Sequence, residues 1–496
     1  MHTTNITNHL NPVVKSKRSQ SALEYMMTYG WAILIIVIVA VILYSMGIFN
    51  PSSSITFTSS GFSPFTVSSS LCNNIGYKIA VLAGPIPNNA NSITINKVFL
   101  TSATGANTTT ASYTLTSPVT LKSGQSATIL IPNVACNSAN THYSLSAKIQ
   151  YSYTASTLGL QTVNTTGIVA GTSITGKPST LTSYEPITIT NSQSSATPSP
   201  FQQMINFTSS DNGWTSISTG NFGQNVEFFY YNGTVIPSWL ENYTSTNGLW
   251  WLKIAAIPSG SSETVYVGFA LTTTNLFNTV NDGEAPQLSS TYAEYDDGAN
   301  VFNYYQRWGG LSSLPSGWSS NGVSPVYYSD YMDLWATSGG TLGNISYAYS
   351  PPYPIILESL ATWAQPNPGS NNGNFGLFTQ SATSTAIQVM TGWGGGGTTN
   401  LGYISSSSSG SMSYSPPSSA SILSIQVASS SEAVFSDNYT NFYTASGQTI
   451  DSASYIQYET TYASSSTSDV FSIYWTRVRA YPPNGVMPSV SFGSVA

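Results

Sequence analysis

A long run without charge near the N-terminus constrains this chain more than any other feature. From Tyr25 to Phe49 no residue is charged, and most of the run reads WAILIIVIVAVILYSMGIF. As a helix its roughly 25 residues reach about 37 Å, more than the ~30 Å hydrocarbon core of a bilayer. Lys15, Lys17 and Arg18 precede the run, and no basic residue follows it closely. The run therefore predicts a membrane-inserted helix with a cytoplasmic N-terminus and an extracellular bulk.

One carboxylate, Glu24, immediately precedes this uncharged run. A charge beside hydrocarbon is costly unless an opposite charge meets it. The text after the run, MGIFNPSSS, contains no small-residue cleavage site of the ordinary secretory kind. The alternative is cleavage before the helix, where basic residues and a small residue are followed by QSALEY.

The stretch QSALEYMMTYGWAILIIV resembles the class III signal peptide of archaeal type IV pilin-like proteins. The resemblance implies that a prepilin peptidase-like enzyme cuts between Ser19 and Gln20, so that residues 1–19 are a leader and residues 20–50 the hydrophobic helix. Glu24 then matches the acidic position of the family, and the freed amine of Gln20 in a neighbouring subunit is its implied partner. This pairing would set the axial register of stacked helices. A plain single-pass anchor, with Glu24 among lipid headgroups, is the alternative.

Charge is scarce along the whole chain. Charged residues make up 6% of the 496 residues, against roughly a quarter in ordinary soluble proteins. The formal net charge is -7 and no basic stripe follows the helix, which argues against nucleic-acid binding. Hydrophobic residues at 41% and aromatic residues at 12% can fill real cores, so disorder is not expected. Because His142 is the one histidine beyond the leader, we expect neither a His-rich zinc site nor a cofactor.

Beyond the helix the pattern is that of β-strands. YKIAVLAG, SITINKVFLTS, ATILIPNV and YSLSAKIQYSYT alternate in polarity and are separated by Asn, Gly, Pro and Ser clusters. Short strands at this spacing predict a small antiparallel sandwich over residues 51–176, in the place of a pilin head. We therefore expect a mainly β chain, with one N-terminal helix followed by tandem antiparallel β-sandwiches.

Two further β units are expected. Residues 177–283 contain YEPITITN, IPSWLE, LWWLKI and IPSGSSETVYV in that order, and resemble a domain of unknown function found in prokaryotic surface proteins. Residues 284–496 carry aromatic strands, end in YWTRVRAYPPNGVMPSVSFG and resemble a concanavalin A-like jelly roll of the lectin and glucanase type. That fold hosts both lectins and hydrolases, so it does not decide function.

The two cysteines of the chain, Cys72 and Cys136, both lie in the expected head. A sparse, even count in an exported protein predicts a single disulfide. Closing a loop of roughly 65 residues would stabilise the head by about 4 kcal/mol on the chain-entropy account. Two buried free thiols are the alternative.

Carboxylates suited to glycoside hydrolysis are sparse in the last unit. A retaining hydrolase needs two of them about 5 Å apart. The sequence most similar to the Glu-x-Asp-x-(x)-Glu pattern of concanavalin-like hydrolases is AEYDDGAN. It would place Glu294 and Asp296 on one face of a strand, but Gly298 and Ala299 stand where the third acid belongs. We therefore expect no enzymatic activity.

Sugar binding fits the composition better, because sugars stack on flat aromatic rings. A large aromatic side chain in a sandwich is more often part of the core. Trp393, in TGWGGGG, is the best candidate for an exposed ring, since the glycines indicate a loop. The tryptophans considered are Trp308, Trp318, Trp335, Trp363, Trp393 and Trp475.

Two further kinds of site are suggested by local patterns. Asp296 and Asp297 form a candidate calcium pair, with a solvated turn as the alternative, and no other metal site is expected. Asn-x-Ser/Thr sequons in an exported chain are candidates for N-glycosylation. The sequons beyond the helix are at Asn107, Asn164, Asn206, Asn232, Asn242, Asn344 and Asn438.

These features together predict a non-enzymatic cell-surface protein. It would be a pilin-like subunit inserted by its N-terminal helix, with membrane lipid and other pilin-like subunits as partners, displaying β domains for contact with surfaces or extracellular glycans. The alternative is a membrane-anchored, lectin-like protein that binds carbohydrate without polymerising. A tethered glycoside hydrolase is a distant third reading.

Overall fold

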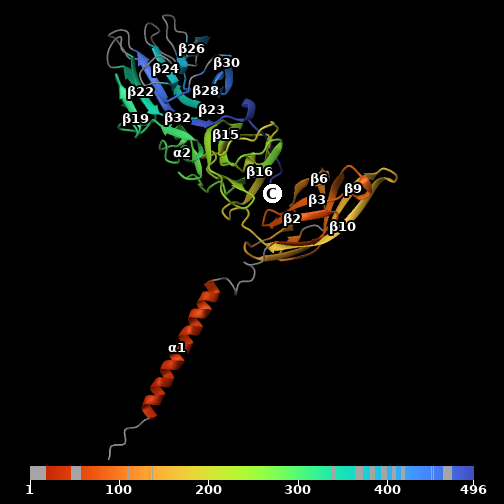
Figure 1. The fold of residues 1–496 in the computed structure, drawn as a ribbon. Coiled ribbons are helices and arrows are strands. Elements are labelled where there is room, and N and C mark those ends of the chain that lie inside the picture. Colours follow the sequence, from red (N-terminus) through yellow and green to blue (C-terminus); the bar gives the residue numbers. More distant parts are fainter. Residues whose placement is uncertain are drawn as a thin grey trace, which may run out of the picture. The chain divides into compact units, whose positions relative to one another are not determined.

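The computed structural model of the protein divides the chain into two compact units, Met1–Gly176 (unit 1) and Lys177–Ala496 (unit 2). It confirms the mainly β architecture, with one long N-terminal helix and tandem sandwiches (Figure 1). The described residues are 18–45, 57–108, 112–132, 134–136, 138–336, 342–362, 372–379, 386–391, 399–404, 409–414, 419–447, 450, 452–461 and 472–496.

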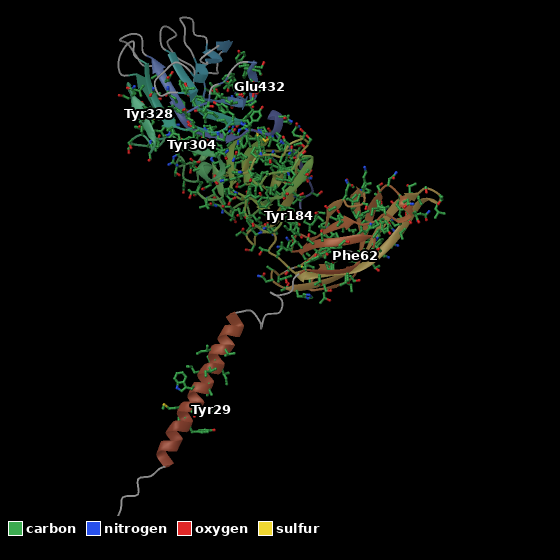
Figure 2. All side chains as sticks on the ribbon, in the orientation of Figure 1. Tyr29, Phe62, Tyr184, Tyr304, Tyr328 and Glu432 are labelled. Carbon is green, nitrogen blue, oxygen red and sulfur yellow. A yellow bond between two sulfur atoms is a disulfide. The ribbon has the colours of Figure 1, made fainter. Side chains whose placement is uncertain are left out.

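Helix α1 spans Arg18–Ser45. Its side chains are described for residues 25–39, all of them exposed, and Figure 2 shows Tyr29 projecting from the ribbon. Ser19, Gln20 and Glu24 lie in α1, but their side chains are outside the described set. A helix that is apolar on every side normally lies buried in a larger assembly or in lipid. The apolar surface of α1 is therefore uncovered in the isolated chain.

The described helices were also compared with the length and hydropathy that a membrane-spanning helix needs. None of these described helices combines the length and the hydropathy required to cross a bilayer.

Unit 1 contains a sandwich of a five-stranded sheet, in the order β1-β10-β9-β4-β6, and a three-stranded sheet, β2-β3-β7, with β5 and β8 as a separate pair. The strands are β1 Thr58–Gly61, β2 Phe65–Cys72, β3 Tyr77–Ala83, β4 Ile93–Thr104, β5 Asn107–Thr108, β6 Ser112–Leu121, β7 Ser126–Ile131, β8 Val134–Ala135, β9 His142–Ala155 and β10 Gly159–Thr172. A short 3₁₀ helix, η2, occupies Pro87–Asn89.

Strict alternation explains why these strands close over one core. Along β9 every second side chain, from Tyr143 to Ala155, is buried, so one face of the strand points inward and the other faces out. Cys72 and Cys136 are buried in the same core and form a disulfide, with their Cα atoms 5.6 Å apart. The bond joins the end of β2 to the segment that follows β8.

The first sandwich of unit 2 consists of the sheets β13-β16-β11-β33 and β12-β15-β14-β17. Its strands are β11 Ser183–Asn191, β12 Phe201–Thr208, β13 Val226–Tyr230, β14 Ser238–Tyr243, β15 Asn247–Ile254, β16 Ser261–Phe269, β17 Asp282–Glu284 and β33 Ser489–Phe492. Among its described residues, unit 2 contains the 3₁₀ helices η3 Trp214–Ser216, η4 Pro286–Leu288 and η5 Pro483–Gly485. The C-terminal strand β33 pairs with β11, so the chain returns to the first sandwich at its end.

The second sandwich of unit 2 consists of two sheets. One has the order β20-β21-β32-β23-β28-β29-β30, with β18 paired to β32 as well, and the other has the order β19-β22-β31-β24-β25. Its elements are α2 Gly298–Val301, β18 Tyr304–Arg307, β19 Trp318–Asn321, β20 Val323–Tyr327, β21 Met332–Ala336, β22 Leu342–Ala348, β23 Ile355–Thr362, β24 Asn372–Phe378, β25 Ala386–Thr391, β26 Thr399–Ile404, β27 Ser409–Tyr414, β28 Ser421–Ser429, β29 Glu432–Asp437, β30 Thr440–Ser446, β31 Tyr455–Thr461 and β32 Ser472–Ala480.

The two sandwiches of unit 2 share an apolar interface. Leu240 and Trp250 face the core of the first sandwich, whereas Trp239 and Trp251, on the opposite face of the same two strands, pack with Trp475 of β32. The inner face of β32 contributes to the core of the second sandwich. Four sheets are therefore stacked in sequence, and β14, β15 and β32 are covered on both faces.

The disulfide generates the first testable prediction. Replacing Cys72 and Cys136 together by alanine should lower the free energy of unfolding of unit 1 by about 4 kcal/mol, because the unfolded chain regains the entropy of an open loop. Residues 57–176 contain no tryptophan and ten of the eleven tryptophans lie in unit 2, so tryptophan fluorescence reports chiefly on unit 2, whereas hydrogen exchange of the β9 amides reports on unit 1. The urea unfolding midpoint should shift by hydrogen exchange alone. Equal stability of wild type and variant would contradict the prediction.

Candidate functional site

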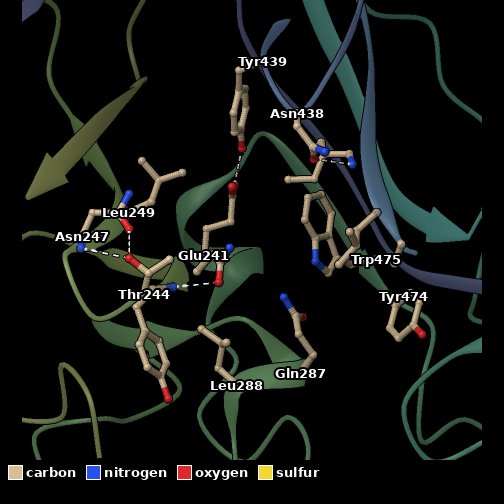
Figure 3. A pocket seen from close by; sticks show the side chains of 15 residues that line it. Glu241, Thr244, Asn247, Leu249, Gln287, Leu288, Asn438, Tyr439, Tyr474 and Trp475 are labelled. Carbon is tan, nitrogen blue, oxygen red and sulfur yellow. Dashed lines mark hydrogen bonds between the residues drawn. The ribbon is translucent and has the colours of Figure 1, made fainter. Parts of the chain in front are cut away.

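A pocket of about 570 Å³ lies between the two sandwiches of unit 2 (Figure 3). Its walls come from β14, β15 and η4 on one side and from β23, β28, β32 and the turn after β29 on the other. The lining residues are Glu241, Asn242, Tyr243, Thr244, Asn247, Leu249, Gln287, Leu288, Leu360, Ala420, Ile422, Asn438, Tyr439, Tyr474 and Trp475.

Two β-bulges shape this pocket. The pairing of β14 with β15 slips between Leu240 and Asn242, so Glu241 has no cross-strand partner. The pairing of β23 with β32 slips in the same way, leaving Tyr474 as the extra residue. A bulge re-aims the side chain that it carries. Both extra residues line the pocket, one from each sandwich.

The rim repeats one tetrapeptide pattern from two distant parts of the chain. Residues 241–244 read ENYT and residues 437–440 read DNYT. In each copy the acid is buried and the asparagine is exposed at the pocket. Asn438 accepts a hydrogen bond from the backbone N–H of Ile422 at 3.1 Å, which holds its side chain over β28. Two amide groups therefore face one pocket from opposite walls.

A buried network of charges lies beneath the pocket. Arg477 on β32 donates through Nε to Glu358 Oε2 at 2.7 Å, and its Nη1 lies 2.7 Å from Glu241 Oε2. Arg479 donates to Glu358 Oε1 at 2.9 Å. Tyr439 accepts a hydrogen bond from Arg477 Nη2 at 2.7 Å and donates its own hydroxyl to Glu241. The two arginines balance the two carboxylates, so the network has no formal net charge.

Aromatic rings surround the central guanidinium. The Arg477 guanidinium carbon lies 4.6 to 5.5 Å from the ring centroids of Trp239, Trp251, Phe302 and Trp475. Burial alone would raise the pKa of Glu358, but the guanidinium groups of Arg477 and Arg479 and their hydrogen bonds lower it to about 2. Glu358 therefore stays ionised well below the pH at which an ordinary carboxyl group gains a proton, and both of its oxygens accept hydrogen bonds from the arginines.

The pocket offers the chemistry of polar recognition rather than of proton transfer. Its exposed groups are the amides of Asn242, Gln287 and Asn438, the hydroxyl of Thr244, and the ring of Tyr243, which stacks on Phe222 at 4.5 Å between centroids. The one carboxylate in its lining, Glu241, also accepts from Trp251 Nε1 at 2.8 Å. A general acid or nucleophile needs a carboxyl group that is free to react.

The pair expected on one strand face, Glu294 and Asp296, does not form. Residues 291–297 adopt turns rather than a strand. Glu294 is exposed and accepts a hydrogen bond from Thr291. The side chain of Asp296 is only 3% exposed, and it accepts hydrogen bonds from Trp239 Nε1 at 3.1 Å and from Tyr305 at 3.0 Å. The strand prediction was wrong because the Asp-Asp-Gly sequence favours a turn, which leads into a short helix, α2.

The other predicted site residues are dispersed. Asp297 is 1% exposed, so it does not lie in a solvated turn, and its neighbour Asp296 is already satisfied by donors. Trp308, Trp318 and Trp475 are buried, while Trp363 and Trp393 lie outside the described residues and the side chain of Trp335 is not described. Thus no tryptophan with a described side chain in the second sandwich is an exposed platform.

The sequons differ in exposure. Asn344 is 1% exposed within β22, which leaves no room for an attached glycan in this fold. Asn107 lies in β5, where its side chain is not described. The exposed sequons are Asn164, Asn206, Asn232, Asn242 and Asn438.

Sequence reasoning missed the network of Glu241, Glu358, Arg477 and Arg479. One signal was present: TRVR, in a strand-like stretch, places two arginines on one face at a spacing of two residues. Two buried cations on one strand face require acidic partners. The sequence did not indicate which carboxylates those are.

Comparison with known proteins gives limited guidance. No protein-family model matches the chain. It is 29% identical over 351 residues to uncharacterized protein 562 of Sulfolobus islandicus rod-shaped virus 1, a match that covers 62% of this chain and 58% of the viral protein. The chain thus spans little more than half the length of that relative.

Solved structures that resemble part of the chain include lectins and hydrolases. The Emp47p carbohydrate recognition domain matches with a TM-score of 0.29 and 12% identity, over 36% of this chain and 95% of that domain. The Ca2+-bound VIP36 exoplasmic/lumenal domain gives 0.27 and 11%, over 37% and 93%. A beta-1,3-glucanase from Mycobacterium marinum gives 0.26 and 12%, over 36% and 98%. At such scores these likenesses identify neither a ligand nor an activity.

Removing the central guanidinium should destabilise unit 2. Arg477→Met leaves Glu358 and Glu241 buried without this cation, and a broken buried pair costs about 3–5 kcal/mol. A matched control is Arg307→Met, because Arg307 is 37% exposed and lies 3.9 Å from Asp296, a contact worth less than about 1 kcal/mol. The stability losses of both variants are measured by urea unfolding, with tryptophan fluorescence as the signal. Similar losses in the two variants would contradict the central role of Arg477.

Acid should weaken the same network. The pKa of Glu358 in the folded protein, about 2, lies below the ordinary value of 4.5, so its contribution is complete above about pH 4.5 and is lost as the pH falls towards 2. We expect the difference in unfolding midpoint between wild type and Glu358→Gln to be constant from pH 7 to pH 5. It should then shrink below about pH 4.5. A difference that stays constant down to pH 2.5 would rule out this linkage.

Proposed function

We propose that this protein is a non-enzymatic surface protein that binds extracellular glycans in the pocket between the two sandwiches of unit 2. The observation that carries the proposal is the composition of the pocket lining. Amide side chains stand on opposite walls, and Tyr243, Tyr439 and Tyr474 also line the pocket. A pocket of about 570 Å³ falls within the usual range for small-ligand sites, roughly 300–1,000 Å³.

The chemistry of a sugar matches this lining. Amides donate and accept hydrogen bonds at once, as vicinal hydroxyl groups require, and Asn242, Gln287 and Asn438 reach the pocket from three separate segments. Aromatic rings such as Tyr243 and Tyr474 suit the C–H faces of a pyranose. Charge is nearly absent from the exposed lining, which favours a neutral ligand over an ionic one.

The same contacts support a binding role without hydrolysis. A retaining hydrolase needs one carboxyl group that can lose a proton and a second that can attack. Glu358 is fully buried and ion-paired with two arginines, and Glu241 is held by Arg477, Trp251 and Tyr439. Neither carboxylate of this region is available for such work.

Glycan arrays test the proposal with full-length protein in detergent, made in a host that does not add N-glycans. Binding to an oligosaccharide should fall by about 5- to 150-fold in Tyr474→Ala and in Asn438→Ala, since each removes a contact worth about 1–3 kcal/mol. Tyr328→Ala is the matched control, because Tyr328 is 40% exposed and lies outside the pocket lining.

Three results would decide against this function. The first is that the wild-type protein binds none of the oligosaccharides, the second is that binding survives both pocket substitutions, and the third is that the protein releases shortened sugars. The first two exclude the pocket as a glycan site, and the third excludes a non-enzymatic role.

A second function, display in a pilin-like assembly, is favoured by the exposed apolar side chains of α1. We infer that helices of other pilin-like subunits cover this surface after cleavage between Ser19 and Gln20. From Tyr25 to Val39 no side chain of α1 is buried within the chain. Apolar surface of this extent normally marks an interaction site.

Processing is testable on protein purified from its native cells. Mass spectrometry should find Gln20 as the first residue, and Glu24→Gln should reduce the yield of filaments, because the freed amine then lacks its carboxylate. Glu294→Gln, a change of an exposed acid in unit 2, serves as the control. An intact N-terminus, or unchanged filament yield in Glu24→Gln, would refute the assembly role.

A further inference from the structure

The outer edge of β10 in unit 1 is open along the first part of the strand. On one side, β9 pairs with every residue of β10 in a long hairpin without a bulge (Figure 1). On the other side, β1 pairs only with residues 167–170. Among the described residues, no strand pairs with the outer edge over residues 159–165. An edge of this kind is a template for a further strand.

The backbone groups at this edge have a fixed direction. In an antiparallel pair the N–H and C=O of one residue point to the same side, and the side alternates along the strand. Thr166 directs its carbonyl outward, because it accepts a hydrogen bond at 2.9 Å from a backbone N–H in the connection between β1 and β2. Leu160, Thr162 and Asn164 therefore point outward too. In the described chain their N–H groups have no hydrogen-bond partner, and among their carbonyls only that of Leu160 has one, the Gln161 side chain at 3.2 Å.

The same edge is apolar and uncharged. Among the described side chains of the unit 1 sandwich, the exposed large hydrophobic ones are Leu71, Leu158, Leu160, Val163 and Ile168. All but the first belong to β10 or to the turn before it. No residue from 149 to 176 is charged. Edge strands are normally protected by charges, proline or bulges, and β6 at the opposite edge has Pro118 and an irregular pairing with β4. β10 has none of these protections.

We propose that the outer edge of β10 pairs with the same edge of a second copy of this chain, as antiparallel strands related by a two-fold axis at Thr162. Thr162 then lies opposite Thr162 of the partner subunit, and Leu160 lies opposite Asn164 of the partner subunit. Each outward N–H of either copy meets an outward carbonyl of the other. The two five-stranded sheets become one continuous sheet.

Symmetry and charge favour a second copy as the occupant of this edge. A two-fold interface requires a surface that is complementary to itself, and the outward residues are placed evenly on both sides of Thr162. Copies with a formal net charge of -7 repel each other in general, whereas the uncharged residues 149–176 bring no like charges together. In this register Leu158 of the partner subunit lies opposite Thr166, where β1 ends, so the hairpin turn and β1 do not compete for one part of the edge. The contact requires neither glycan binding nor cleavage of the leader.

Disulfide trapping tests the proposal with full-length protein in detergent, made in a host that adds no N-glycan to Asn164. Opposite residues of a hydrogen-bonded pair have Cα atoms about 5.5 Å apart, within the usual range of a disulfide, about 4.4–6.8 Å. The two native cysteines are bonded to each other, so Thr162→Cys supplies a single free thiol, and mild oxidation should convert it into a covalent dimer. Ser117→Cys is the matched control, because Ser117 is exposed on the opposite edge strand, β6, and should give no dimer.

A backbone substitution measures the contribution of the edge. Thr162→Pro removes an outward N–H that is unbonded in the single copy, and proline is tolerated at such positions of edge strands. Hydrogen exchange of the β9 amides should therefore stay unchanged. Sedimentation in density-matched detergent should show association weakened about 5- to 150-fold, since two hydrogen bonds are lost per dimer.

Three results would overturn the proposal. No covalent dimer in Thr162→Cys would leave the edge to a strand of another protein. Equal amounts of dimer in Thr162→Cys and Ser117→Cys would mean association through α1 or chance collision. Unchanged association of Thr162→Pro would mean that copies meet through another surface. Should the proline variant fail to fold, the two cysteine variants decide.

Discussion

The buried guanidinium of Arg477 is the interaction on which unit 2 depends. A cation removed from water must meet compensating charge, and here that charge comes from both sandwiches, Glu358 on β23 and Glu241 on β14. The aromatic rings around Arg477 also come from both sides of the interface. Neither sandwich could bury its half of this network alone. The first and second sandwiches are consequently parts of one folded unit.

The candidate pocket is a consequence of the same junction. Two flat sheets packed face to face would leave little space between them, but bulges at Glu241 and Tyr474 turn side chains into the gap. The bulge at Glu241 also allows its carboxylate to reach Arg477. The bulge at Glu241 therefore contributes both to the buried charge network and to the wall of the pocket. The stability of the interface and the shape of the pocket depend on the same residue.

The structural elements that depend on a local residue pattern could be predicted from the sequence. The alternation along β9 and the hydrophobic run of α1 are periodic signals, and both elements form where they were expected. The return of β33 to pair with β11 has no local signal, because it joins residues about three hundred positions apart. Residues 291–297 were misjudged as a strand because alternation of Glu294 and Asp296 outweighed the turn propensity of the Asp-Asp-Gly sequence.

The candidate site was less predictable than the fold, for a physical reason. Its residues come from bulges and turns on two sandwiches, and single-strand patterns do not say which turns will meet. The candidate tryptophans of the second sandwich are buried wherever their side chains are described, whereas the pocket is lined by tyrosines and amides. The two Asn-Tyr-Thr sequences were noted as sequons, and only folding brings them to one rim.

Native-state hydrogen exchange of the full chain tests most directly whether the Arg477 junction makes unit 2 a single folded unit. Amides of β15 in the first sandwich and of β32 in the second should exchange through one common opening, with the same free energy and the same denaturant dependence. Two distinct opening free energies, with β15 exchanging while β32 stays protected, would contradict this account and make the sandwiches independent domains.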